Sequence, residues 1–374
     1  MIRLDTLTGL ATAPGPFAVA YLDATRAKEL GPQEVEKRWR ALRGSLAEQG
    51  ADEATLDEMQ AAVGRHDVPG EHGQALVAAH GRLLGDYALP GRPRRETARW
   101  SPLPHLMPLV AQLRPVVPYV LALVDRIGAD ITVHGPGGES EATVDGGTYP
   151  IHRTGLGGWS ALRYLHRTED LWERNAREVA DVIESGVRRT AARVVILAGD
   201  VRARETLRKV LDEPARDLVV ELQTGGRAEG IDEEKLREEV DGVVARAAAD
   251  ADQAVVAQFQ EAHGRASAGI GPIFAVAGLA DTVEALRKAQ VETLLVVDDP
   301  SSDAEAWVGP EPIHLALDRS ELSALGVDDA VRDRLDAALI RAAAGTDAAV
   351  VTLAPGQLDL RDGLGAVLRY PDPT

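Results

Sequence analysis

The stretch YVLALVDRIGADITVHG, residues 119–135, decides the fold predicted for the middle of the chain. Its first half is a continuous apolar run that ends in charge, and GADITVHG follows at hairpin distance. We therefore expect two antiparallel strands here, and a third short strand near 141–144. ARVVILAGD, residues 192–200, has the uniformly apolar character of a buried parallel strand.

A long helix is predicted between these strands, from residue 159 to 190, because apolar residues recur there at helical spacing. They are Leu162, Leu165, Leu171, Val179, Val182 and Ile183. A second helix over 201–211 and a strand at DLVVEL, residues 217–222, complete a pattern of strands followed by βαβ. This pattern predicts one α/β unit.

The N-terminal part of the chain predicts a smaller α/β unit. FAVAYL, residues 17–22, is typical of a strand, 32–49 and 52–63 of amphipathic helices, and 74–89 of a hairpin. The segment 90–118 is dense in proline and arginine, so we expect a connector with at most one short helix.

The C-terminal part alternates helices with strands. We expect helices over 232–266, 274–286 and 328–344, and strands at VETLLVV, AAVVTL and GAVLRYP. The sequence therefore predicts an α/β protein of three domains, with boundaries at 1–115, 116–228 and 229–374.

The composition excludes several classes of protein. There is no cysteine, which removes disulfides, thiolate nucleophiles and cysteine-ligated metal sites. The net charge of −18 argues against a surface that coats nucleic acid throughout, although local basic patches remain compatible with it. The N-terminus lacks the apolar run of a signal peptide and no segment is long enough without charge to span a membrane, so we expect a cytoplasmic protein.

The glycine-rich loops do not match known phosphate-binding motifs. GPGG at 135–138 and GLGG at 155–158 lack the Lys-Ser/Thr of a P-loop and the context of a dinucleotide fingerprint, and a hairpin turn is the simpler interpretation of the first. Ser160 is best explained as a helix N-cap. His152 and His166 are too dispersed to suggest zinc. We predict no cofactor.

Three carboxylates leave a metal-dependent alternative open. Asp125, Asp130 and Asp200 stand at predicted strand ends, where two-metal nucleases place their ligands. Such residues more often end strands and cap turns, so we expect no metal site.

The run YPIHRTGLGGWSALRYLHRT, residues 149–168, stands out in an acidic chain because it has no acidic residue. Positive charge for phosphates, flat rings for stacking and small residues for close approach are what RNA contact requires. A solvated helix with Trp159 as a core anchor explains the run about as well. The basic and aromatic residues are Tyr149, His152, Arg153, Trp159, Arg163, Tyr164, His166 and Arg167. A second cluster of basic residues follows, formed by Arg188, Arg189, Arg193, Arg202, Arg204, Arg208 and Lys209.

VLALVDRIGADI, a glycine-rich loop, and GGWSALRY at the start of a long helix together resemble the middle domain of the archaeal and eukaryotic class-I release factors and Pelota. The resemblance is closer to the bacterial, actinobacterial-type branch of this superfamily, which includes the Balon-like ribosome hibernation factors. ARWSPLPHLMPLV, WERNAREVADVI and the C-terminal unit with AGLADTVEALRKAQVETLLVVDD and GLGAVLRY extend it over residues 95–374. It implies a ribonuclease H-like middle domain and a C-terminal domain of the type found in kink-turn-binding ribosomal proteins.

One departure from the release factors bears on activity. Where they carry Gly-Gly-Gln, whose glutamine helps to position the hydrolytic water, this chain has Gly157, Gly158 and Trp159, and no glutamine occurs from Leu113 to Leu222. An indole is bulky and has a single donor, so it cannot take the place of the amide. The N-terminal unit also lacks Asn-Ile-Lys-Ser, so stop-codon reading does not carry over.

The resemblance thus implies a ribosome-binding translation factor that occupies the A site in stress or dormancy without releasing peptide. It implies ribosomal RNA as the ligand, EF-Tu as a partner, contact of the C-terminal domain with the ribosomal stalk region and, by our expectation, a monomer. The alternatives are a ribosome-rescue peptidyl-tRNA hydrolase or release factor, and, more remotely, the nuclease. The residues expected to bind RNA are Arg153, Gly157, Gly158, Trp159, Ser160, Arg163, Tyr164 and Arg167.

Overall fold

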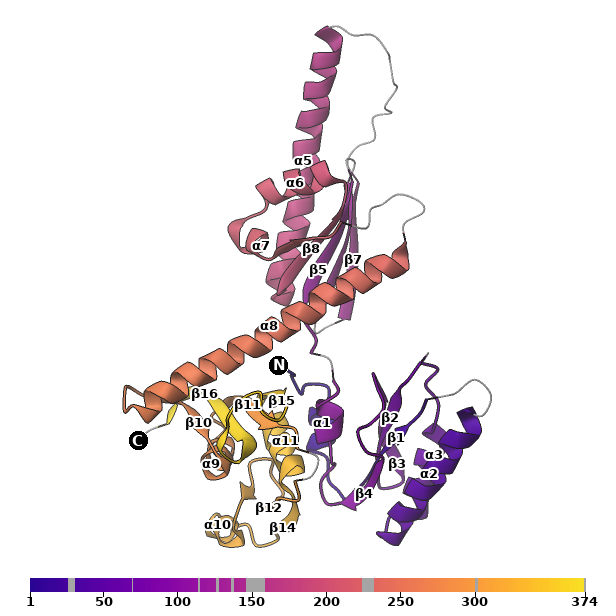
Figure 1. Cartoon of the computed structure of the whole chain (residues 1–374), viewed down its shortest axis with the longest axis vertical. Coiled ribbons are helices and arrows are strands. Elements are labelled where there is room, and N and C mark those ends of the chain that lie inside the picture. Colours follow the sequence, from indigo (N-terminus) through magenta and orange to yellow (C-terminus); the bar gives the residue numbers. More distant parts are fainter. Residues whose placement is uncertain are drawn as a thin grey trace. The chain divides into compact units, whose positions relative to one another are not determined.

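The computed structural model describes residues 1–25, 31–68, 70–113, 115–125, 128–135, 138–145, 159–223, 232–299 and 302–372. The chain forms two compact units, of which the first combines Met1–Pro115 with Asp252–Thr374 and the second is Val116–Ala251 (Figure 1). The protein is a mixed α/β structure with several sheets, as the sequence predicts. Among the described residues, no helix combines the length and apolar character that crossing a membrane requires.

The N-terminal part of the first unit is a four-stranded antiparallel sheet in the order β3-β2-β1-β4. Alternate residues of β1 face opposite sides of this sheet. One side packs on α2 and α3, and the other faces the remainder of the unit. The predicted strand, helices and hairpin are confirmed as β1 (Phe17–Asp23), α2 (Gly31–Glu48), α3 (Glu53–Ala62), β2 (Gly73–Ala79) and β3 (Arg82–Leu89).

The expectation of a connector over 90–118 is wrong in part, because β4 (Thr97–Ser101) lies within it, before the short helix α4 (Met107–Val110). β4 is an edge strand, and the side chain of Gln49 covers its open side. The Gln49 amide donates to the carbonyl of Ala98 at 3.1 Å and accepts from the amide of Trp100 at 2.9 Å. One carboxamide thus occupies the backbone groups that would otherwise invite another strand.

The C-terminal part of the unit contains a second sheet, in the order β10-β16-β11-β15. The chain enters it from α8 (Glu233–Ser267), whose first part belongs to the second unit. Residues 274–286 do not form one helix as predicted, because IFAVA pairs with the last strand and the helix begins only after Gly278. The elements are β10 (Ile273–Ala277), α9 (Leu279–Arg287), β11 (Val291–Val297), α11 (Leu335–Gly345), β15 (Ala349–Leu353), η1 (Arg361–Gly363) and β16 (Leu364–Asp372).

A small three-stranded sheet, β13-β12-β14, with the helix α10 is inserted between β11 and α11, and the sequence pattern did not predict it. The predicted helix over 328–344 is also too long, because its first residues form β14. A buried guanidinium holds the insertion: Arg341 donates to the carbonyls of Gly309 at 2.9 Å and Glu311 at 3.0 Å, and also to that of Pro310. The elements are β12 (Glu305–Val308), β13 (Leu315–Ala316), α10 (Arg319–Ala324) and β14 (Val331–Arg334).

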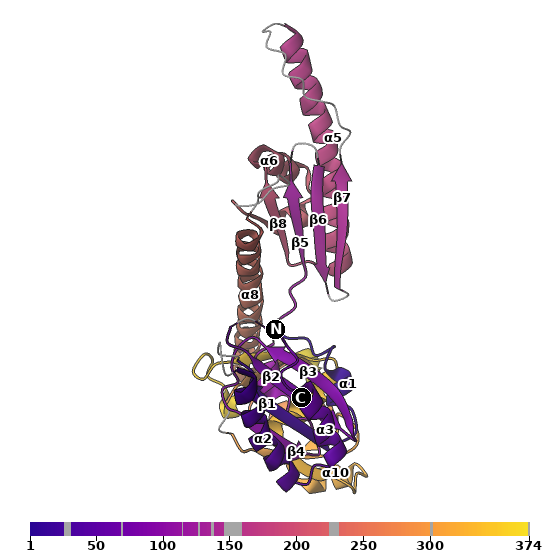
Figure 2. The same cartoon turned by 90° about the vertical axis from the view of Figure 1, so that its right-hand side faces the viewer.

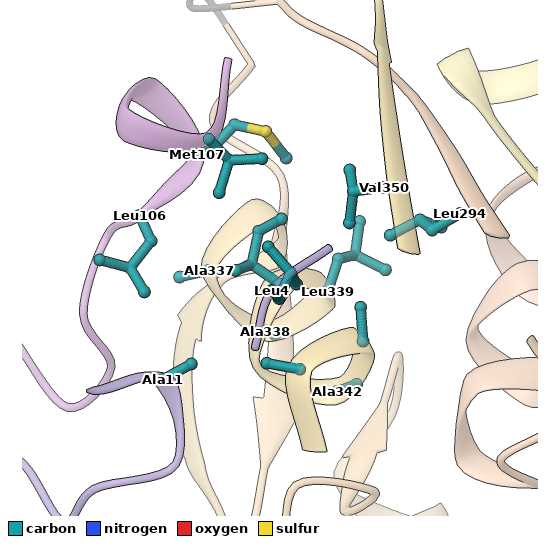
Figure 3. Packing of buried hydrophobic residues seen from close by; sticks show 14 of the residues in the cluster. Leu4, Ala11, Leu106, Met107, Leu294, Ala337, Ala338, Leu339, Ala342 and Val350 are labelled. Carbon is teal, nitrogen blue, oxygen red and sulfur yellow. The ribbon is translucent and has the colours of Figure 1, made fainter. Parts of the chain in front are cut away.

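Helix α11 is the centre of the first unit. Its sequence LDAALIRAAAG is buried from Leu335 to Ala344 except at the half-buried Asp336, so side chains lie around almost its whole circumference. Figure 3 shows Leu4 and Ala11 from the N-terminal segment and Met107 from α4 converging on it, with Val350 of β15 on the far side. Alanines permit these approaches because a larger side chain would hold the segments apart. The N-terminal segment also contains α1 (Thr8–Ala11) and pairs Ile2 with Val350.

Polar contacts join the segment before α4 to the start of α11. Asp336 accepts from His105 at 3.2 Å and from Arg334 at 2.7 Å. Burial alone would raise the pKa of Asp336, but these hydrogen bonds and charges outweigh it and hold the pKa well below its ordinary value. The neighbouring Asp333 accepts from the amide of Leu103 at 2.7 Å, and burial raises its pKa.

The second unit is built on a five-stranded sheet in the order β7-β6-β5-β8-β9, which Figure 2 shows nearly face-on except for β9. The first three strands are antiparallel and the last three are parallel, as the sequence predicts. Helices α5, α6 and α7 cover one face and the first part of α8 packs on the other. The elements are β5 (Tyr119–Val124), β6 (Gly128–Gly135), β7 (Gly138–Asp145), α5 (Trp159–Thr190), β8 (Val194–Gly199), α6 (Val201–Val210), α7 (Glu213–Asp217) and β9 (Val219–Glu221).

Enlarging the alanine face of α11 should destabilise the first unit. Ala338 is 2% exposed, so Ala338→Leu forces the surrounding segments apart and should lower the free energy of unfolding by about 1–3 kcal/mol. The same change at the exposed Ala245 of α8 is the control and should cost less than about 0.5 kcal/mol. Urea unfolding measures both, and equal losses would contradict the packing of α11.

The Asp336 contacts should give stability that depends on pH. Because the pKa of this carboxyl is lowered on folding, its contribution is complete above the unfolded pKa of about 3.9 and is lost as the pH falls through the folded value. Asp336→Asn should therefore lower the thermal midpoint at pH 7 and have a smaller effect at pH 3. Asp359→Asn, at an exposed position, is the control. An equal penalty at both pH values would show that the carboxylate charge is irrelevant.

Candidate RNA-binding site

Strand β7 ends at Asp145 and helix α5 begins at Trp159, so the predicted RNA-binding residues fall between and just after these two elements. Arg153, Gly157 and Gly158 lie outside the described residues, as do Tyr149 and His152. The other predicted residues, Trp159, Ser160, Arg163, Tyr164 and Arg167, belong to the helical backbone of α5, and their side chains lie outside the described part, as does that of His166.

The helical backbone gives these positions a definite order. Residues 159, 163 and 167 recur every four positions, which places them on one side of α5, and residues 160 and 164 have the same spacing. Positions 159, 163 and 167 therefore lie on one side of the first three turns. This grouping follows from the helix and was not part of the sequence prediction.

The second half of α5 fixes the helix to its sheet. Ala176, Val179, Ala180 and Ile183 are buried against the strands. Gly186 is needed for this contact, because a Cβ atom there would lie 3.0 Å from a methyl group of Val133. The close contact fixes the second half of α5 to the sheet.

The second basic cluster is exposed except for Arg204, and several of its side chains have partners within the unit. Arg204 is 2% exposed and donates to Glu221 at 2.9 Å, and Arg208 lies 3.6 Å from the same carboxylate. Arg188 lies 3.5 Å from Asp212 and 3.7 Å from Glu184, and Arg189 donates to Ser140 at 3.2 Å. Arg193, Arg202 and Lys209 are exposed. Three of the seven charges, those of Arg188, Arg204 and Arg208, are therefore in ion pairs within the unit, which reduces the charge that this cluster has available for RNA contact.

The three carboxylates of the nuclease alternative follow or join strands at one edge of the sheet, but each has a local structural role. Asp125 accepts from the amide of Gly128 at 2.8 Å and closes the β5–β6 turn. Asp130 accepts from the hydroxyl of Thr143 at 3.2 Å. Asp200 caps α6 by accepting from the amides of Arg202 and Ala203 at 2.9 and 3.0 Å. Within the described ranges, no three His, Asp or Glu residues are placed to hold a metal ion.

Sequence reasoning missed one buried polar residue near this edge. Asn175 of α5 is 7% exposed, and with Asp125 and Gly128 it lines a small cavity beside the β5–β6 turn. The signal was present in the sequence, since Asn175 stands among residues that follow the apolar spacing of the helix. A buried amide at this junction connects α5 to the turn that ends β5.

Comparisons with known proteins identify the family. The model of bacterial archaeo-eukaryotic release factor family 2 matches residues 118–265. The proteins Rv2629 and MT2704 of two Mycobacterium tuberculosis strains, both named uncharacterized, are 32% identical to this chain over 374 residues, covering 99% of it and 97% of their own length. This chain belongs to one family with these two mycobacterial proteins, and its residues 118–265 are similar to the release factor family. The matched region holds the whole five-stranded sheet and the helix α5 of this family member.

Several solved structures are similar to this family member over nearly its whole length. A ribosome-bound archaeal Pelota, described with ABCE1, has a TM-score of 0.40 and 18% identity, covering 98% of this chain and 94% of its own. Archaeoglobus fulgidus Pelota has a TM-score of 0.37 and 14% identity, with coverages of 99% and 93%. The archaeal termination factor aRF1 has a TM-score of 0.26 and 16% identity, with coverages of 98% and 97%.

Removing the cap of α6 tests the structural role of Asp200. Asp200→Ala leaves two amides of the first turn without an acceptor and should lower the free energy of unfolding by roughly 0.5–2 kcal/mol. The exposed Asp217→Ala should cost less than about 0.5 kcal/mol. Melting in Mg²⁺ and in EDTA should give the same midpoint for the wild type. A Mg²⁺-dependent rise that Asp200→Ala abolishes would instead indicate a metal site.

Proposed function

We propose that this protein is a ribosome-associated translation factor that occupies the ribosomal A site during stress or dormancy and does not release the peptide. The observation that carries the proposal is Trp159, which stands, within the region that matches the release factor family model, where the glutamine of Gly-Gly-Gln is expected. Its role is that of the Balon-like hibernation factors, which the sequence resembles.

The chemistry of the third loop position separates occupancy from hydrolysis. A glutamine amide has both a donor and an acceptor, and so it can orient a water molecule beside an ester bond. The indole of Trp159 has one donor and a large apolar face, which suits stacking on a nucleobase. The first half of α5 therefore binds RNA and supplies no group that positions water.

In this proposal, the middle and C-terminal domains predicted from the sequence bind different parts of the ribosome. We assign the middle domain to the ribonuclease H type, and the strand order β7-β6-β5-β8-β9, with three antiparallel strands followed by two parallel ones, supports this assignment. Its α5 presents Trp159, Arg163 and Arg167 to ribosomal RNA, with Arg153, Gly157, Gly158, Ser160 and Tyr164 completing the contact. The C-terminal domain is of the kink-turn-binding type and faces the ribosomal stalk region.

The partners of this function are the ribosome, through its RNA, and EF-Tu as the delivering factor. The protein acts as a cytoplasmic monomer. The net charge of −18 supports this form of recognition, because an acidic chain has little affinity for RNA in general and leaves binding to the local basic segment.

A paired binding and release assay tests the proposal. Purified protein is added to ribosomes that carry peptidyl-tRNA in the P site and have an empty A site. The wild type should co-sediment with the ribosomes and leave the peptidyl-tRNA intact. Trp159→Ala should weaken co-sedimentation roughly ten-fold, in line with the loss of one stacked base of about 1–3 kcal/mol.

The control is Tyr370→Ala, which removes an exposed ring of the C-terminal strand and should bind like the wild type. Release of the peptide by the wild type would overturn the proposal and favour the rescue hydrolase. Equal binding by the wild type and Trp159→Ala would remove the indole from the contact.

A further inference from the structure

A cleft of about 730 Å³ lies within the first unit. Arg95, Thr97 and Arg99, from β4 and the residues just before it, line one wall. The end of β11 and the start of α11 line the other, with Asp298 and Asp336 among their residues. The cleft is of the size that small-molecule sites usually have.

The carboxylates of this cleft already have partners. Asp298, of which 12% is exposed, lies 2.6 Å from Arg94, and Asp336 lies 2.7 Å from Arg334 and 3.2 Å from His105. Asp303 is 98% exposed and lies 3.7 Å from Arg334, and Asp362 accepts from the amide of Leu279. The carboxylates of the acidic wall are thus mostly paired with a donor or exposed to water.

Two guanidiniums on the basic wall are not matched in this way. In the parts of the chain that the structure describes, Arg95 and Arg99 have no carboxylate within ion-pair distance. Arg99 is half-buried. It acts on the buried Asp333 only through space, since the Asp333 carboxylate accepts from the amides of Leu103 and Arg334. Partial burial of a guanidinium costs solvation free energy when no anion is hydrogen-bonded to it. An anionic ligand would offset that cost.

We propose that this cleft binds the phosphate of a nucleotide, either free or within an RNA strand. Arg95 and Arg99 supply planar guanidiniums, which match phosphate oxygens with paired hydrogen bonds. The hydroxyl of Thr97, on the same face of β4 as Arg99, is a third donor. The proposal does not depend on the role of Trp159.

Binding to the isolated full-length protein tests the site with two probes. Calorimetry measures AMP, and fluorescence anisotropy measures a labelled single-stranded oligouridine of ten residues. Arg99→Gln and Arg95→Gln should each weaken the binding of the probe that the wild type takes by ten-fold or more. Arg82→Gln, at an exposed arginine of the same sheet that does not line the cleft, should leave binding unchanged. Circular dichroism and melting confirm that each variant is folded.

The two probes distinguish the source of the phosphate. Binding of AMP that both cleft variants weaken would assign the site to a free nucleotide. Binding of the oligonucleotide alone, with the same loss in both variants, would assign it to an RNA strand. The proposal is overturned if neither probe binds at millimolar concentration, or if the cleft variants bind like the wild type. Trp159→Ala serves as a further comparison, because it should not alter AMP binding.

Discussion

The burial of α11 around almost its whole circumference is the constraint on which the first unit depends. A helix can be surrounded at close range only if its side chains are small, and LDAALIRAAAG provides alanine at five of eleven positions. Segments from the start of the chain, from α4 and from β15 all meet it. The N-terminal and C-terminal parts therefore share one core within this unit, although more than two hundred residues of sequence separate Leu106 from Ala337 and Ala338.

The second unit achieves rigidity in a different way. Its sheet is covered on both faces, and α5 is fastened to it through Gly186 and the apolar residues of its second half. The second half of α5 is therefore fixed to the sheet, and the first turns continue from it. This helix begins at Trp159, within the region that matches the release factor family model. The basic and aromatic residues at the start of α5 thus lie within the region that matches the family model.

Elements with strong periodicity were predictable from the sequence, and elements that depend on tertiary contacts were not. The apolar strands β5 and β8 and the long helix α5 have unambiguous patterns. β4 was missed because TARWS is short and polar, and its pairing with β1 is a long-range contact. IFAVA was assigned to a helix because a short apolar run fits both periods, and only its pairing with β16 decides between them.

The candidate RNA-binding site was likewise only partly predictable from the sequence. Sequence reasoning could identify the basic and aromatic run around Trp159, but it could not foresee that Arg204 is buried against Glu221, since that pair joins α6 to a strand seventeen residues away. The sequence also could not show that Arg95 and Arg99 lack a carboxylate partner among the described residues, because the absence of a partner depends on the three-dimensional surroundings. A count of basic residues along the sequence therefore includes the buried Arg204 as if it were exposed. The same count gives no sign of the cleft that Arg95 and Arg99 line.

The most direct measurement of the central claim is a cryo-electron microscopy map of ribosomes that carry this protein, purified from starved cells. The account predicts density for the protein in the A site, with the start of α5 against ribosomal RNA and an intact peptidyl-tRNA or an empty P site beside it. Density at any other ribosomal site, or a deacylated P-site tRNA whose peptide the protein has released, would contradict it.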